Sequence, residues 1–246
     1  MMARFHGSDC RVYLGYRDAS ADLVSVDITA TAEPIDVTTF ASDNWRAVDP
    51  GLTSWEGSFS GFWQTNAGAS ATTIERQIEI MLASNTAGQS LMSVYLGDAD
   101  AVGDTGYLTS EAVLSKWASP IAVADLVKVS GTLKGNGQFG VNGVLLHPSA
   151  TDSTSTNGTT FDGSAASSYG GRANLHVTAA SGTGGIIKVQ HSTNGSTWVD
   201  LITFTTTSTT TAETNTVTGT VNRYLRYIST INSTSSLTFV VGFARY

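Results

Sequence analysis

The stretch that decides the fold runs from residue 23 to residue 63 and reads LVSVDITATAEPIDVTTFASDNWRAVDPGLTSWEGSFSGFW. Leu23–Thr31 alternates apolar and polar residues, which is typical of a β-strand with one buried face. One face takes Val24, Val26 and Ile28, and the other takes Asp27 and Thr29. Ser58–Trp63 returns to the same alternation. The stretch therefore predicts two strands that flank a long connection.

The connection between these strands is polar and rich in turn residues. Asp49-Pro50-Gly51 is its strongest breaker. We therefore expect one long loop, Thr39–Thr53, and long loops in compact domains are usually functional. Trp45 lies in this loop beside Arg46, and such a pair is typical of an anchor in a protein interface; the alternative is burial of Trp45 within its own chain.

Working outward, the sequence predicts one helix among several strands in the first half of the chain. Thr72-Thr73-Ile74-Glu75 is a capping box, and an apolar stripe follows it, which predicts a helix over Thr72–Ser84. Further strands are expected at Arg11–Tyr16, Leu91–Leu96, Tyr107–Trp117, Ala124–Leu133 and Phe139–Leu146. One helix amid about seven strands indicates a mainly β fold, a β-sandwich or barrel with a helix laid against it.

The remainder of the chain shows strand patterns without a helix signal. Strands are expected at Ala173–Ala179, Ile186–His191, Thr197–Phe204, Thr214–Thr220, Arg223–Thr230 and Leu237–Arg245. Asn194-Gly195 is a hairpin signal between two of them, since both residues tolerate positive φ. This regular spacing predicts a jelly-roll or immunoglobulin-like β-sandwich.

Charge and texture divide the chain at His147-Pro148. Residues 1–148 hold eight positive charges against 16 acids, a net charge of −8, and residues 149–246 hold five against four, a net charge of +1. Residues 149–168 are rich in Ser, Thr and Gly, as in a linker. We therefore expect an acidic domain at 1–148, a linker at 149–168 and a second β-sandwich at 169–246.

Composition and motifs exclude several classes of function. A sequence pI of about 4.9 excludes a basic nucleic-acid-binding surface over the whole molecule. A single cysteine, Cys10, excludes an internal disulfide, and no run of about 18 apolar residues predicts a membrane span. Gly135–Gly140 matches G-x-G-x-x-G, but a strand is expected after it, so we interpret it as a turn.

Nothing in the sequence predicts a catalytic or metal site. The four histidines lack metal-ligand spacing. Asp98, Asp100 and Asp104 form a calcium-like run without the later glutamate of an EF-hand. No nucleophile elbow is present. We therefore expect no enzymatic activity, no catalytic residue, no cofactor and no metal.

Four runs in the first half resemble the major tail tube proteins of long-tailed, non-contractile bacteriophages. These runs are Ile35–Phe40, Asp43–Arg46, Pro50-Gly51-Leu52 and Gly57–Trp63. The predicted helix and closing strands follow the same plan, so the resemblance covers residues 1–148. The second half resembles the decoration domains that some of these proteins carry outside the tube.

The resemblance implies a structural virion protein. Its members form hexameric rings that stack into a tail tube through which DNA is ejected, with strands closing into a barrel around a lumen. Carried over to this chain, Leu23–Val37 and Ser54–Trp63 supply the wall, and the loop reaches an adjacent subunit. The implied inter-subunit residues are Thr39, Phe40, Trp45, Arg46, Pro50, Gly51 and Leu52.

The resemblance also implies partners and a location. The partners are further copies of the chain and the tape measure, terminator and distal tail proteins, and the location is the virion, assembled in the host cytoplasm. Six acidic domains around a lumen repel phosphates, so DNA passes without specific binding. We expect Asp27, Asp36 and Glu56 among the acids that line it.

Two other hypotheses stay open for the second half. A host-surface or glycan contact on the tube exterior is suggested by Trp198 and Tyr169 in the Thr-rich sandwich. The alternative to a tube is a standalone two-domain adhesin or lectin that binds carbohydrate. Assembly separates the two readings, because tube proteins polymerise and a lectin stays small.

Overall fold

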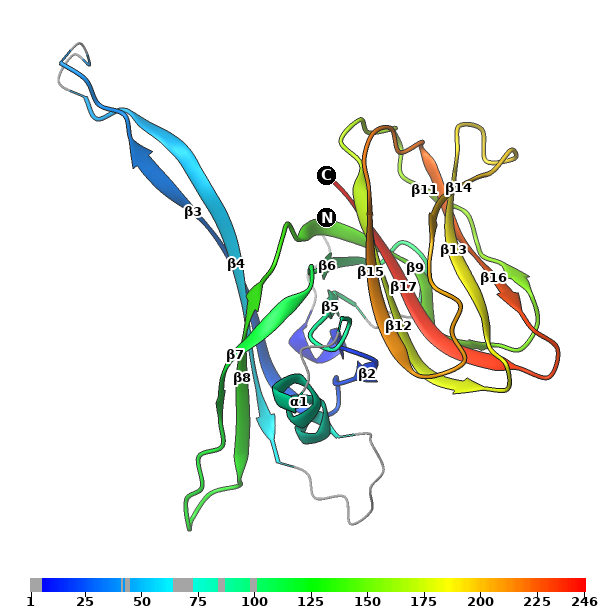
Figure 1. Ribbon diagram of the computed structural model, residues 1–246, viewed down its shortest axis with the longest axis horizontal. Helices are drawn as coiled ribbons and strands as arrows, with labels where there is room; N and C mark the ends of the chain where they lie inside the picture. The colour runs from blue at the N-terminus through cyan, green and yellow to red at the C-terminus, as the bar shows by residue number, and fades with distance from the viewer. Residues whose placement is uncertain (1–5, 41, 43–44, 64–72, 84–86, 98–100) are drawn as a thin grey trace.

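The computed structural model describes residues 6–40, 42, 45–63, 73–83, 87–97 and 101–246. The described chain folds into three antiparallel β-sheets, one α-helix and a short 3₁₀ helix, η1 (Gly7–Asp9). The fold is mainly β, as predicted. None of the helices in these described ranges is long and apolar enough to cross a membrane. Figure 1 shows a body of packed sheets from which one long ribbon projects.

The largest sheet has eight strands drawn from both halves of the chain. Its order is β15-β12-β17-β9-β6-β5-β1-β2. The strands are β1 (Arg11–Leu14), β2 (Arg17–Asp18), β5 (Met92–Tyr95), β6 (Thr105–Leu108), β9 (Gly140–Asp152), β12 (Gly171–Ser181), β15 (Thr211–Val217) and β17 (Ser236–Arg245). Strands that were expected in each half are therefore found together in this one sheet.

A second sheet of four strands packs against β1 and β5 of the large sheet. Its order is β3-β4-β8-β7. The strands are β3 (Leu23–Asp36), β4 (Val48–Phe62), β7 (Ala112–Ala118) and β8 (Lys128–Gly135). Trp55, Phe59 and Leu133 of this sheet pack with Val12 and Met92 of the large one in a single apolar core.

Helix α1 (Ile74–Ala83) contributes to the same core. Ile74, Ile78 and Met81 are buried there, which confirms the predicted apolar stripe, whereas Leu82 is exposed. Thr72, the first residue of the expected capping box, lies outside the described residues. The helix packs against the face of the four-stranded sheet that carries the core, which we call the inner face (Figure 1).

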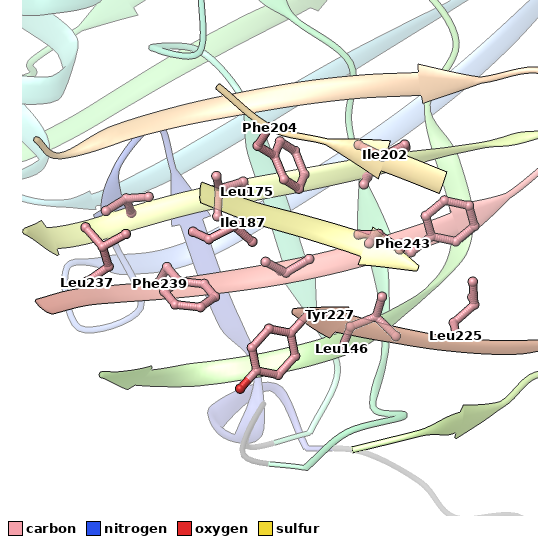
Figure 2. Close-up of a cluster of buried hydrophobic side chains, with 14 of the residues drawn as sticks. Leu146, Leu175, Ile187, Ile202, Phe204, Leu225, Tyr227, Leu237, Phe239 and Phe243 are labelled. Atoms are coloured by element: carbon pink, nitrogen blue, oxygen red, sulfur yellow. The ribbon is translucent and has the colours of Figure 1, made fainter. Parts of the chain in front are cut away.

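The third sheet completes the C-terminal sandwich. It joins β10 (Thr156–Asn157), β11 (Phe161–Asp162), β13 (Gly185–Ser192), β14 (Val199–Thr203) and β16 (Tyr224–Ile231). The hairpin between β13 and β14 turns at Asn194-Gly195, where Gly195 has φ +71°, as the sequence predicted. Figure 2 shows the core, to which Phe239 and Phe243 of β17, Ile187 of β13 and Tyr227 of β16 contribute.

The segment 149–168 differs from the expected linker. Residues 149–152 continue β9 and pair with β17, while β10 and β11 both pair with β16. Thr is enriched in strands, so a Thr-rich composition does not by itself distinguish a linker from exposed strands. The proposed boundary at His147-Pro148 falls inside β9, and the division into two domains stays a prediction.

A buried polar network joins the two halves behind β12. His176 Nδ1 lies 2.6 Å from the Gly15 carbonyl oxygen and its Nε2 lies 2.8 Å from Ser93 Oγ. Asn174 donates to Ser93 Oγ and to the Thr109 carbonyl, both at 3.1 Å. Directional bonds of this kind fix one arrangement of the packed layers, because an unmade bond leaves a buried polar group unsatisfied.

Candidate functional site

The candidate site consists of surfaces rather than a catalytic pocket, and the first is a two-stranded ribbon. β8 pairs with β4 only from Glu56 to Phe62, so Val48–Trp55 has β3 as its neighbour within the sheet. Figure 1 shows this ribbon, in blue and cyan, standing clear of the body. Most of its side chains are exposed. An isolated two-stranded ribbon is marginally stable, so a covering surface would stabilise it.

The described residues at the end of the ribbon, 37–40, 42 and 45–47, are called the tip here, and they combine backbone hydrogen bonds with exposed apolar rings. Val37 N–H donates to the Ala47 carbonyl at 3.0 Å, and Trp45 N–H donates to the Ser42 carbonyl at 2.7 Å. Phe40 is nevertheless fully exposed and Trp45 is 82% exposed. Burying two such rings removes a large apolar area from water. Contact of these two rings with another surface would therefore be favourable.

An ion pair holds the base of the tip. Arg46 Nε lies 3.0 Å from Asp36 Oδ2, and both side chains are about half exposed or more. Hydrogen bonds from Thr38, and then the Arg46 guanidinium, hold the pKa of Asp36 below its usual value. Asp36 therefore has a partner at the far end of the ribbon.

The structure corrects the extent of the predicted loop. Thr39, Phe40, Trp45 and Arg46 belong to the tip, but Pro50, Gly51 and Leu52 lie in β4. The register shifts between Ala32 and Pro34 of β3, and Pro50 lies opposite Pro34. Proline lacks an N–H and is tolerated because the ribbon is only two strands wide here. Leu52 is 83% exposed, and its role between subunits stays a prediction.

The second surface is the outer face of the four-stranded sheet. Strand alternation and the cross-strand register place mostly hydroxyl side chains there. They are Ser25, Thr29, Thr31, Ser54, Ser58, Ser60, Ser130 and Thr132. Asp27 and Glu56 are on this face, and so are Lys116, Lys128 and Lys134. Glu56 lies directly opposite Lys134, so the charges of the face are nearly balanced.

The third surface comprises the two free edges of that sheet. β3 and β7 have no partner strand on their outer sides within the described chain. Every pairing in the sheet is antiparallel, so with four strands the two edge strands run in opposite directions. A groove of about 510 Å³ follows the β3 edge from Leu23 to Ile28, and Val94, Leu96 and Phe139 form its far wall.

A fourth surface lies at the end of the sheet opposite the tip. The connection from β7 to β8 exposes Ile121, Val123 and Leu126, and Phe62 and Trp63 of the β4 end are partly exposed. Trp63 N–H donates to the Val127 carbonyl at 2.8 Å, which joins the two segments. We call these five side chains the base patch.

Sequence reasoning missed both the base patch and Trp117. Ala124–Leu133 was expected to be a strand, whereas β8 begins at Lys128. Ile121, Val123 and Leu126 follow Ser119-Pro120, and apolar residues after such a breaker were the available signal. Among the described residues no three His, Cys, Asp or Glu side chains are placed to hold a metal ion. Asp98 and Asp100 lie outside those residues.

Comparison with known proteins gives likenesses of modest strength. No protein-family model and no curated protein matches the chain. Among solved structures, a chain of the native gene transfer agent virion is 19% identical, with a TM-score of 0.41, over 56% of this chain and 97% of its own. The SPP1 tail tube is 12% identical, with a TM-score of 0.39, over 55% and 77%. The SPP1 Dit protein is 9% identical, with a TM-score of 0.34, over 96% and 99%. Likeness at this level does not establish a function.

Proposed function

We propose that this chain is the subunit of a phage tail tube, in which copies form rings and the rings stack. One observation carries the proposal. A four-stranded sheet with two free edges continues into a ribbon whose aromatic tip has no cover in the described chain. Free edges and exposed apolar tips favour association, and natural monomers usually avoid both.

The edge directions support a closed ring. When copies are repeated by rotation about one axis, β7 of each copy meets β3 of the next in antiparallel orientation, because the two edges run in opposite directions. The sheet then continues through every junction and closes into a barrel without edges. The number of six copies per ring rests on the resemblance in residues 1–148.

The outer face of the sheet supports a water-filled lumen. Its Ser and Thr hydroxyls bond to water, and Asp27 and Glu56 are the acids we propose to line the wall. Three lysines on the same face offset them, so in place of the acidic conduit expected from the sequence we propose a hydroxyl-rich wall of nearly balanced charge that does not bind DNA. Asp36 is the last residue of β3 and forms an ion pair with Arg46, so we propose a role for it at the tip and not in this wall.

The tip and the base patch support stacking. They lie at opposite ends of the same sheet, as the positions of the β3–β4 tip and the β7–β8 connection show in Figure 1. Two different apolar surfaces at opposite ends make a head-to-tail contact, which repeats without limit along an axis. We propose that Phe40 and Trp45 of one ring cover the base patch of the next.

The C-terminal sandwich belongs on the exterior in this arrangement, where it is free to meet a host surface. The Arg226 guanidinium lies over the Trp198 ring, 4.3 Å from its centroid, and Tyr169 is exposed. We keep a glycan contact as a separate proposal, tested by a glycan array with the full chain. Binding of no glycan above background would remove it.

Electron microscopy of the purified chain tests the main proposal. Negative-stain images taken over a range of protein concentrations and salt are expected to show cylinders of uniform width. A chain that stays monomeric under all of these conditions would refute the proposal and favour the standalone lectin.

A further inference from the structure

The groove at the β3 edge has apolar side chains on two walls and is also lined by Ser20, Ser25 and Asp27, and no other part of the described chain fills it. Val26 and Ile28 of β3 form one wall, and Val94, Leu96 and Phe139 form the other. Val24, at the rim, is 66% exposed. The groove opens at the inner face of the four-stranded sheet, the side that carries the core.

The opposite edge of the sheet presents an aromatic ring on the same inner side. Trp117 of β7 lies opposite Gly131, which lies opposite Phe59 of the core. Residues directly opposite one another share a face, so Trp117 is on the inner side. It is 44% exposed, although tryptophan gains most from full burial.

We propose that the groove at the β3 edge receives Trp117 from a second copy of this chain. The inference rests on the proposed ring, in which β7 of one copy meets β3 of the next, and it names the side chain that fixes that junction. The tilt of strands in a barrel displaces neighbouring copies along each other. Several registers between β7 and the neighbouring β3 keep the inner faces of the two copies on the same side. We expect the register that places Trp117 in the groove to be selected, because it buries the ring.

Charge on the outer side of the two edges agrees with this register. Within Leu23–Ile28 the charged residue is Asp27, and in β7 it is Lys116, the neighbour of Trp117. Both are exposed and both are on the outer face. Neither forms an ion pair with another of the described residues. When Trp117 enters the groove, the Lys116 ammonium faces the Asp27 carboxylate across the junction.

Photo-crosslinking tests the junction without removing the aromatic ring. Benzoylphenylalanine is placed at position 117, and in a matched variant at position 113. Val113 is 47% exposed on the same strand but on the outer face. Irradiation of assembled protein, followed by digestion and mass spectrometry, is expected to join position 117 to residues 23–28 of another copy. The variant at 113 is expected not to label the groove residues.

Substitutions measure what the contact contributes. Trp117→Ala is expected to raise the protein concentration needed for assembly about thirtyfold, the effect of losing an aromatic interface anchor. Val199→Ala, at an exposed residue in the other half of the chain, is the control and is expected to leave this concentration unchanged. Lys116→Glu and Asp27→Lys are each expected to weaken assembly, and the double variant to restore it. Circular dichroism confirms that each variant is folded.

The outcomes separate this inference from the proposed function. Tubes whose crosslinks from position 117 miss residues 23–28, or that form equally well with Trp117→Ala, would overturn the inference and leave the tube proposal standing. Crosslinks into the groove from small oligomers, without tubes, would support the junction and refute the tube. If the protein shows no crosslinks and no assembly, the inference and the tube proposal are both refuted.

Discussion

The stability of the chain is expected to fall between pH 7 and pH 5 because His176 is buried between the two halves. Burial lowers the pKa of His176 to about 4, despite its bond to the Gly15 carbonyl. A histidine in the unfolded chain has a pKa near 6.5. The unfolded state therefore binds the proton first as the pH falls, and stability is lost from pH 6.5 down to about 4.

The difference of about 2.5 pH units corresponds to about 3 kcal/mol for complete protonation. Between pH 7 and pH 5 the expected loss of unfolding free energy is about 2 kcal/mol. The structural reason is that Nδ1 faces a carbonyl and Nε2 faces Ser93 Oγ, which also accepts from Asn174. A second ring proton would need that hydroxyl to turn.

Urea unfolding of the unassembled chain at pH 7 and at pH 5 measures this loss, and His176→Gln is the matched variant. Its amide keeps a donor for the Gly15 carbonyl but does not titrate. Asp22 and Glu111, whose pKa values are raised first of all by burial, titrate equally in both proteins and cancel in the comparison. Equal losses of stability in wild type and variant would refute the reasoning.

Three further outcomes are expected. The double variant Phe40→Ser with Trp45→Ser should abolish tubes in electron micrographs. It should change the unfolding free energy by less than about 0.5 kcal/mol, since both rings are exposed. A large loss of stability would show that these rings pack within their own chain. Gly131→Ala should destabilise the chain by about 1–3 kcal/mol in urea, because its new methyl would lie 2.3 Å from the Phe59 ring, whereas Gly7→Ala, with open space around it, should not. Asn174→Ala should cost about 1–3 kcal/mol in the same assay by leaving buried partners unbonded, and an unchanged midpoint would show that water replaces the side chain.

Local pattern predicted the strands well because their physics is local. The strand over Leu23–Thr31 and the turn at Asn194-Gly195 depend on neighbouring residues alone, and both are confirmed, although a register shift after Leu23 leaves Val24 66% exposed. Pro50 misled the prediction, because a proline breaks a central strand but not a ribbon with one neighbour. Whether a strand is central depends on sheet order, which alternation does not encode.

Some features of the site could not be predicted from the sequence because they depend on which distant strands pair. Trp45 was identified from its polar surroundings, whereas Trp117 and the groove at β3 have meaning only once both sheet edges are known. The same limit applies to the segment 149–168, whose hydroxyl-rich composition suits an exposed strand and a linker equally. The roles of Asp27 and Glu56 at the lumen stay predictions.

The position of β17 has a consequence for biosynthesis. β9 and β12 do not pair with each other, and each is bonded to β17, which lies between them. A ribosome must therefore translate β17 (Ser236–Arg245) before the large sheet can become continuous. Chains that stop before Ser236 lack the strand that joins β9 to β12, so they cannot complete this sheet.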